Sequence, residues 1–185
     1  MPSPIGHFLA GLCVYSATEF DLARPVSPRR LGLVTAAALA PDLDLVLNAL
    51  TGRNYHQAES HSVGFALLAG LAAWVFAASR RWRHPRRLGL GVGLAWLTHV
   101  ALDYLSADTA VPIGLTALWP ITDGWYKFPW PVFLPISRSL EWGALARNLL
   151  AAAWEAVLLT PVLALVWRLT SRRRGVGPEP GRDTA

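Results

Sequence analysis

The feature that most constrains this chain is a run of 18 residues without a charged side chain, SVGFALLAGLAAWVFAAS, from Ser62 to Ser79. A helix of about 20 apolar residues crosses the hydrocarbon core of a bilayer. Of all 185 residues, 53% are hydrophobic and only 16% are charged, which leaves too few polar residues to cover a soluble domain. The sequence therefore predicts an integral membrane protein.

Five apolar segments approach or reach the length of a spanning helix. The first is short, and Pro41 interrupts the second because proline lacks a backbone donor and clashes with the preceding turn, so either could be re-entrant. The predicted fold is all-α, a polytopic membrane bundle of about five helices. The segments are Pro4 to Phe20, Leu31 to Leu50, Ser62 to Ser79, Leu88 to Leu105 and Leu145 to Trp167.

The connection between Ser106 and Leu145 is rich in Trp and Pro. Its prolines argue against a continuous helix and its aromatic side chains suit a membrane–water interface, so we expect an interfacial loop or lid. The polar, Gly- and Pro-rich residues 172–185 are predicted to be a disordered cytoplasmic tail. Residues 1–171 are then one membrane-embedded domain.

Basic residues are distributed unevenly between the two sides of the predicted spans. Because cytoplasmic loops retain Lys and Arg, the distribution predicts a multi-pass protein of the cell membrane, with the N-terminus outside and the C-terminus in the cytoplasm. These flanking positions account for the net charge of +5, and no basic reading helix indicates nucleic acid as a partner. Thirteen of the 17 basic residues lie on the cytoplasmic side, and the other four are Arg53, Lys127, Arg138 and Arg147.

Several ionisable residues lie inside the apolar segments, where they are costly and usually mark a functional or paired site. Counted at ~1.5 Å per helical residue, they lie about 17 to 27 Å from the basic end of their segments. This places them all in the outer half of the membrane. The orientation came from basic residues alone, so the shared depth independently indicates that they meet. These residues are His7, Asp42, Asp44, His61, His99, Asp103 and Glu155.

Two short motifs carry most of this signal. His99 and Asp103 are four residues apart, which puts both on one helix face, as two ligands of one metal require, although a structural His–Asp hydrogen bond is an equal alternative. Asp42 and Asp44, in PDLD at a helix break, would point to different sides. One could bind a metal while the other orients a histidine ligand from behind. The alternative for PDLD is a helix cap.

The other histidines differ in strength. His61 lies at a helix start and is well placed to bind a metal, whereas His56 could equally be an exposed loop residue. His7 alone is more often a packed interfacial histidine, and His84 belongs to a basic, solvated loop. Imidazole and carboxylate ligands without thiolate suit Zn²⁺ or Mn²⁺, and the number of candidates allows one or two ions.

GHFLAG, APDLD, HQAESHS, LTHVALD and PIGLTALWP follow one another in this order. With these motifs the chain resembles the YdjM-like family of membrane-bound metal-dependent hydrolases over roughly Pro4 to Pro135, and it is distantly similar to zinc-dependent phospholipases C and related nucleases. Gln57 and Ser60 stand where the family pattern has Arg and Thr. The resemblance also implies a distal carboxylate, either Glu141 or Glu155. The metal-binding set that it implies is His7, Asp42, Asp44, His56, His61, His99 and Asp103.

These observations favour a hydrolase in which a divalent metal activates water against an ester or phosphoester, with a lipid or lipid-linked molecule as substrate. Asp42 and Asp44 are the candidate catalytic carboxylates. One rival is an ion or proton transport protein, which predicts polar residues at several depths. Another is a non-catalytic membrane protein with a structural metal site.

Overall fold

The computed structural model describes residues 1–18, 27–108, 111–137, 139 and 141–174. These residues form six α-helices and two short 3₁₀ helices, η1 and η2. Within this part of the chain the only β pairing is two isolated bridges, which confirms the all-α prediction. In chain order the elements are α1 (Pro4–Thr18), α2 (Pro28–Ala37), η1 (Ala40–Leu43), α3 (Asp44–Thr51), η2 (Glu59–His61), α4 (Val63–Ser79), α5 (Pro85–Tyr104) and α6 (Trp142–Arg174).

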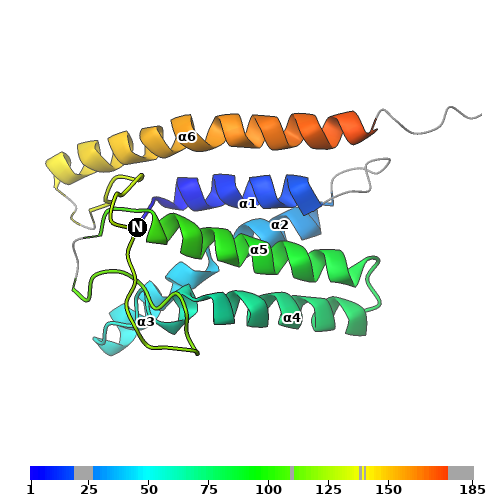
Figure 1. Cartoon of the computed structure of the whole chain (residues 1–185), viewed down its shortest axis with the longest axis horizontal. Helices are drawn as coiled ribbons and strands as arrows, with labels where there is room; N and C mark the ends of the chain where they lie inside the picture. Colours follow the sequence, from blue (N-terminus) through cyan, green and yellow to red (C-terminus); the bar gives the residue numbers. More distant parts are fainter. Residues whose placement is uncertain (19–26, 109–110, 138, 140, 175–185) are drawn as a thin grey trace, which may run out of the picture.

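The long helices lie roughly parallel or antiparallel to one another (Figure 1). α5 packs against α1, α2 and α4, and α6 packs mainly against α1. α1, α4 and α6 all begin at one end of the bundle, and α5 ends there, together with η1 and η2 (Figure 1). The arginine-rich turn between α4 and α5 and the last turns of α6 lie at the opposite end. The basic residues that the sequence analysis assigned to one side of the membrane therefore gather mainly at one end of the bundle.

Small side chains let the central helices approach closely. Ala38, Ala77 and Ala95 are fully buried in a cluster that joins α1, α2, α4 and α5. Where α4 crosses α5, a Cβ atom on Gly70 would lie 2.9 Å from the carbonyl oxygen of Gly89. Any larger residue at Gly70 would force the two backbones apart.

Two local signals in the sequence position the site. Ser62 caps α4 by accepting a hydrogen bond from the amide of Phe65 at 3.1 Å, so His61 lies just before a well-defined helix start. The second signal is Pro41, which lies in η1 just after the break that ends α2. The chain turns by 64° between α2 and the segment Ala40–Thr51. This bend brings the PDLD carboxylates to the end of the bundle where α5 finishes.

The number of membrane spans is smaller than predicted if each helix is judged by length and composition. Within the described residues, only the stretch Trp142–Ser171 of α6 is long and apolar enough to cross a bilayer alone. α2 and the segment Ala40–Thr51 pass this test together, but they are bent. α4 is apolar but only 17 residues long. The five-span arrangement is thus not confirmed.

The last helix differs in its bounds from the prediction, at its start and at its end. The last helix begins at Trp142 and continues to Arg174, so residues 172–174 are helical, and the rest of the predicted tail, 175–185, lies outside the described residues. The first predicted segment extended to Phe20, and its last two residues also lie outside. The Trp- and Pro-rich connection has no helix in its described part. It is held to the bundle by backbone hydrogen bonds such as Val63 N to Ala117 O at 2.9 Å.

Candidate metal centre

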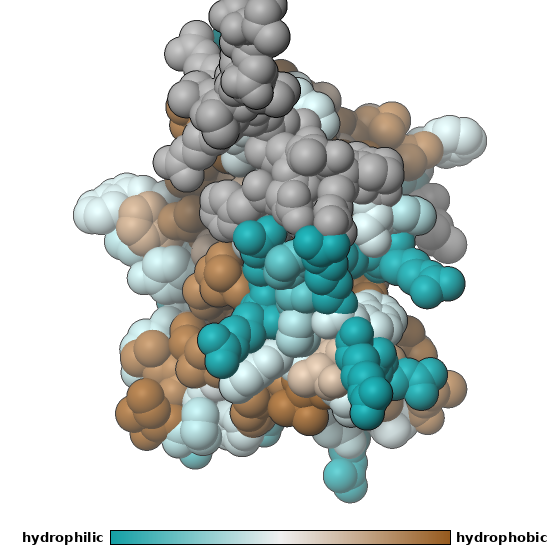
Figure 2. Space-filling view, turned by 90° about the vertical axis from the view of Figure 1, so that its right-hand side faces the viewer, coloured by the Kyte–Doolittle hydropathy of each residue, from teal (hydrophilic) through white to brown (hydrophobic). Residues whose placement is uncertain are grey.

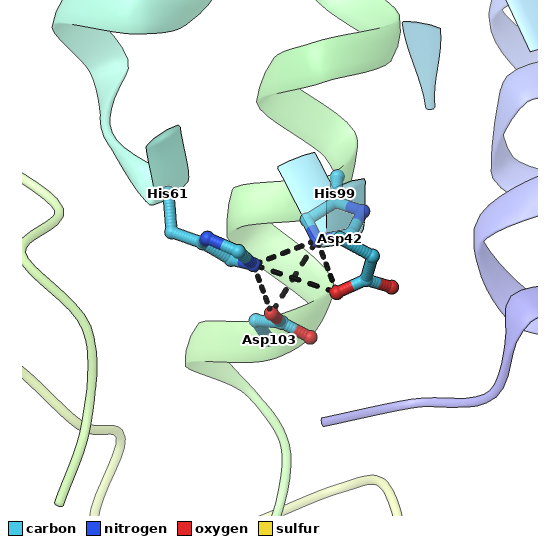
Figure 3. A group of neighbouring side chains, drawn as sticks. All are labelled: Asp42, His61, His99 and Asp103. Atoms are coloured by element: carbon cyan, nitrogen blue, oxygen red, sulfur yellow. Dashed lines mark hydrogen bonds and ion pairs between the residues drawn. The ribbon is translucent and has the colours of Figure 1, made fainter. Parts of the chain in front are cut away.

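Four side chains from three elements converge at the end of the bundle opposite the arginine-rich turn. Asp42 comes from η1, His61 from η2, and His99 and Asp103 from successive turns of α5. Figure 3 shows their polar atoms pointing toward one common point. One ligand atom from each residue lies within 4.8 Å of the other three. The i, i+4 spacing of the α5 pair thus does place both side chains on the face that meets the PDLD break.

The separations between these atoms have the size expected around one small ion. His61 Nε2 lies 3.1 Å from His99 Nε2 and 3.2 Å from Asp103 Oδ2. His99 Nε2 lies 3.5 Å from that same oxygen. Asp42 Oδ1 is 3.6 Å from the Nε2 atom of each histidine. A tetrahedral ion with ligand bonds of 2.0 to 2.1 Å separates its ligand atoms by about 3.3 Å, so the four atoms fit one coordination sphere.

Hydrogen bonds on the far side of each ring decide which nitrogen carries the proton. His99 Nδ1 lies 2.8 Å from the carbonyl oxygen of Ala38, which can only accept, so this nitrogen donates. His61 Nδ1 faces Asp44 Oδ2 at 3.2 Å, and a carboxylate also accepts. In the neutral tautomers, both Nε2 atoms therefore turn lone pairs toward the common point. Such outer partners are typical of metal-bound histidines.

The carboxylates at this point lack hydrogen-bond donors. Among the described residues, no group donates to Asp42 Oδ1 or to either oxygen of Asp103, although all three atoms are buried. Buried oxygens without a partner carry a large desolvation cost. A cation between them would satisfy these oxygens and the two imidazole lone pairs together. The donor set, two imidazoles and two carboxylates without sulfur, suits zinc or manganese.

A second group lies behind His61. The Asp44 carboxylate accepts hydrogen bonds from His56 Nδ1 at 2.9 Å and from the Ser60 hydroxyl at 2.9 Å, and it also faces His61 Nδ1. Asp44, His56 and His61 could themselves hold an ion, but only by using the Nδ1 side of His61. Asp42 and Asp44 therefore face opposite sides of one imidazole, as their spacing at the helix break predicted. His56 is buried rather than an exposed loop residue.

His7 completes the polar cluster from α1. Its ring stacks on that of His99, with centroids 3.8 Å apart, and its Nε2 atom lies 3.5 Å from Asp103 Oδ1. The side chain is fully buried, and no described residue makes a standard hydrogen bond to either ring nitrogen. Asp103 thus presents one oxygen to the four-residue group and the other to His7.

A comparison with known protein families assigns the chain to one of them. The chain matches the model of the YdjM inner membrane protein family over residues 1–175. It belongs to the YdjM family. No curated protein and no solved structure matched the chain. The YdjM assignment makes a lipid bilayer the environment of the fold, and the structure adds buried His and Asp groups that could hold a metal ion.

The two candidates for a distal carboxylate lie elsewhere in this YdjM protein. Glu155 of α6 is fully buried, and its oxygens accept hydrogen bonds from the Ser3 amide at 2.8 Å, the Gly6 amide at 3.1 Å and the Ser3 hydroxyl. It caps the N-terminus of α1 and is in neither possible metal group. Glu141 is exposed, next to the start of α6. His84, expected outside the site, lies in the turn before α5 at the arginine-rich end.

Two contributors were not among the predicted site residues. The Ser60 hydroxyl contacts both Asp44 and His61, at 2.9 and 3.0 Å, and the Ser60 carbonyl accepts from the indole of Trp96 at 2.8 Å. The carbonyl of Ala38 fixes the tautomer of His99. For Ser60 the sequence signal was its position next to the candidate ligand His61. A backbone carbonyl gives no signal at all.

Proposed function

We propose that this protein is a membrane-embedded, metal-dependent hydrolase acting on an ester or phosphoester of a lipid or lipid-linked molecule. The observation that supports it most is the convergence of His61, His99, Asp42 and Asp103 on one point, where three buried carboxylate oxygens have no donor among the described residues. A divalent ion there would act as a Lewis acid that activates water for attack. Zinc is the first choice and manganese the second.

Two carboxylates divide the remaining work in this proposal. Asp42 has 16% of its side chain exposed, whereas the other three residues of the group are essentially buried. The reacting bond therefore approaches from the Asp42 side. Asp44 accepts a hydrogen bond from His61 Nδ1 and so fixes the orientation of that ring. His7, against the second oxygen of Asp103, is placed to serve a second ion.

The proposed substrate class follows from location. The polar cluster lies at one end of an inner membrane protein whose helices expose many apolar side chains, such as Leu67 at 70% and Leu149 at 64%. A lipid phosphoester already presents its bond near this depth, whereas a soluble substrate would have to enter an apolar setting. In the accompanying topology, residues 1–171 form one multi-pass domain, the cluster faces outward, and the C-terminus is cytoplasmic.

Metal-loaded protein in liposomes tests this function against a panel of phospholipids, polyprenyl phosphoesters and lipid esters. We expect turnover that a chelator abolishes and that the added ion restores. Asp42→Asn should lower turnover by at least ~10²-fold, whereas the matched control His84→Ala should retain it. If no member of the panel shows chelator-sensitive turnover, the hydrolase proposal fails.

A structural metal site is the second candidate, and one observation favours it. Four protein ligand atoms converge on one point, and structural zinc sites use four protein ligands, whereas catalytic sites keep one position open. In that case chelation should lower thermal stability without any turnover to lose. Measuring both quantities on the same preparation separates the two functions.

A further inference from the structure

A groove of about 410 Å³ runs along the outer surface of α4 and α5. None of the candidate metal ligands lines it. Its walls come from one face of each helix, with Leu67, Leu71 and Trp74 from α4 and Leu90 and Leu94 from α5. The only charged lining residue is Arg86, at the first turn of α5. The groove is therefore apolar along its length, with the positively charged Arg86 side chain at one end.

Glycine makes this groove deep. Its floor includes Gly70, Gly89 and Gly93, where the two helix backbones touch: a Cβ atom on Gly93 would lie 3.4 Å from the Cα atom of Gly70. Because the floor has no side chains, nothing from these residues fills the groove. The surrounding walls are exposed, Leu71 at 50% and Leu90 at 53%. A bound apolar chain would cover this surface.

The length of the groove matches half a bilayer. Its lining runs from residue 63 to 74 on α4 and from 86 to 97 on α5, which at 1.5 Å per residue is about 16 Å on each helix. One leaflet contributes about 15 Å of the ~30 Å hydrocarbon core. A single acyl chain of a lipid in one leaflet would fill the groove, with the headgroup of that lipid at Arg86.

Arg86 lies at the arginine-rich end of the bundle. Arg80 and Arg81 are exposed on the turn next to Arg86, and Figure 2 shows hydrophilic surface gathered at this end of the molecule, bordered by hydrophobic surface. No hydrogen bond or ion pair to another described residue occupies the Arg86 guanidinium. A second copy docked here in the same orientation would bring another arginine-rich turn beside this one, which charge repulsion opposes.

We propose that the α4/α5 groove binds one acyl chain of an anionic phospholipid, with the lipid phosphate on Arg86. Basic pockets between membrane helices commonly hold anionic headgroups. This inference concerns a site apart from the metal centre and stands whether or not the protein is a hydrolase. Its ligand is a bound lipid of the surrounding leaflet.

Native mass spectrometry of detergent-purified protein, titrated with phosphatidylglycerol or phosphatidylethanolamine, tests the proposal. Arg86→Gln should raise the Kd for phosphatidylglycerol about fivefold, since one arginine near anionic lipid contributes about 1 kcal/mol. It should raise the Kd for phosphatidylethanolamine less, because the ammonium group of that lipid offsets the charge of its phosphate. Leu71→Trp, which narrows the groove from an exposed wall, should weaken both. Arg80→Gln, on the same turn but outside the groove, is the matched control.

Equal Kd values for the two lipids in the unmodified protein would overturn the proposal. So would an Arg80→Gln effect as large as that of Arg86→Gln, because binding would then reflect diffuse charge alone. A dimer that Leu71→Trp dissociates, with lipid binding unchanged, would assign the groove to a second copy. An unchanged unfolding temperature confirms that each variant is folded.

Discussion

The Nε2 atoms of His61 and His99 face each other at 3.1 Å, while the Nδ1 atom of each ring donates a hydrogen bond away from the pair. Two imidazole lone pairs this close repel unless a cation or a proton lies between them. The nearest oxygens, from Asp42 and Asp103, are also acceptors without donors. A divalent ion placed there would satisfy all four atoms, whereas a single proton can satisfy only two.

Metal content gives the first prediction. Purified protein should carry at least one zinc or manganese ion per chain, measured by elemental mass spectrometry. His61→Ala, His99→Ala and Asp103→Ala should each lose it, because each removes one of the converging atoms. His84→Ala should keep it, since His84 lies at the other end of the bundle. Stoichiometric metal in all three site variants would exclude this centre.

The two PDLD carboxylates should behave differently. Asp44→Asn should still bind metal, but with an affinity lowered by about 10 to 100-fold, because Asp44 only orients His61 through its Nδ1 proton. Asp42→Asn should weaken binding more, since Asp42 Oδ1 is one of the four converging atoms. Competition with a fluorescent chelator measures both affinities. The reverse order would exchange the roles assigned here to Asp42 and Asp44.

Glu155 should matter for stability. Glu155→Ala removes an acceptor from the buried amides of Ser3 and Gly6 and should cost about 3 kcal/mol of unfolding free energy. Glu141→Ala should cost almost nothing, because Glu141 is exposed next to the start of α6. Denaturant unfolding in mild detergent compares the two variants. Should both changes be neutral, the capping interaction contributes nothing in the folded protein.

Topology reporters test the proposed orientation. Fusions after Arg83 and after Arg174 should report the cytoplasm, and one inserted near Asp123 should report the outer side. The physical reason is the retention of basic residues in the cytoplasm, which here places 13 of 17 on one side. A cytoplasmic signal near Asp123 would reverse the predicted direction of the metal centre.

The sequence predicted most of the polar cluster because its members obey simple rules. His99 and Asp103 share a helix face through their spacing, and a proline marks the break that turns Asp42 and Asp44 to opposite sides of His61. Depth in the membrane added His7, which indeed stacks on His99. These rules depend only on residue spacing along a helix, which can be counted from the sequence.

Depth alone misplaced Glu155. It lies at the same level as the others, but the direction in which a helix turns its faces depends on its packing partner, and α6 turns Glu155 toward the start of α1. Helix lengths were similarly unreliable. The bend between α2 and α3 and the 17-residue α4 show that an apolar segment need not become a straight, full-length span.

The cap that Glu155 makes on α1 also bears on biosynthesis. α1 leaves the ribosome well before α6, yet a carboxylate of α6 accepts hydrogen bonds from the start of α1, from which His7 reaches His99. The surroundings of His7 therefore take their final form only after α6 has packed against α1, whereas Asp42, His61, His99 and Asp103 all precede α6 in the chain.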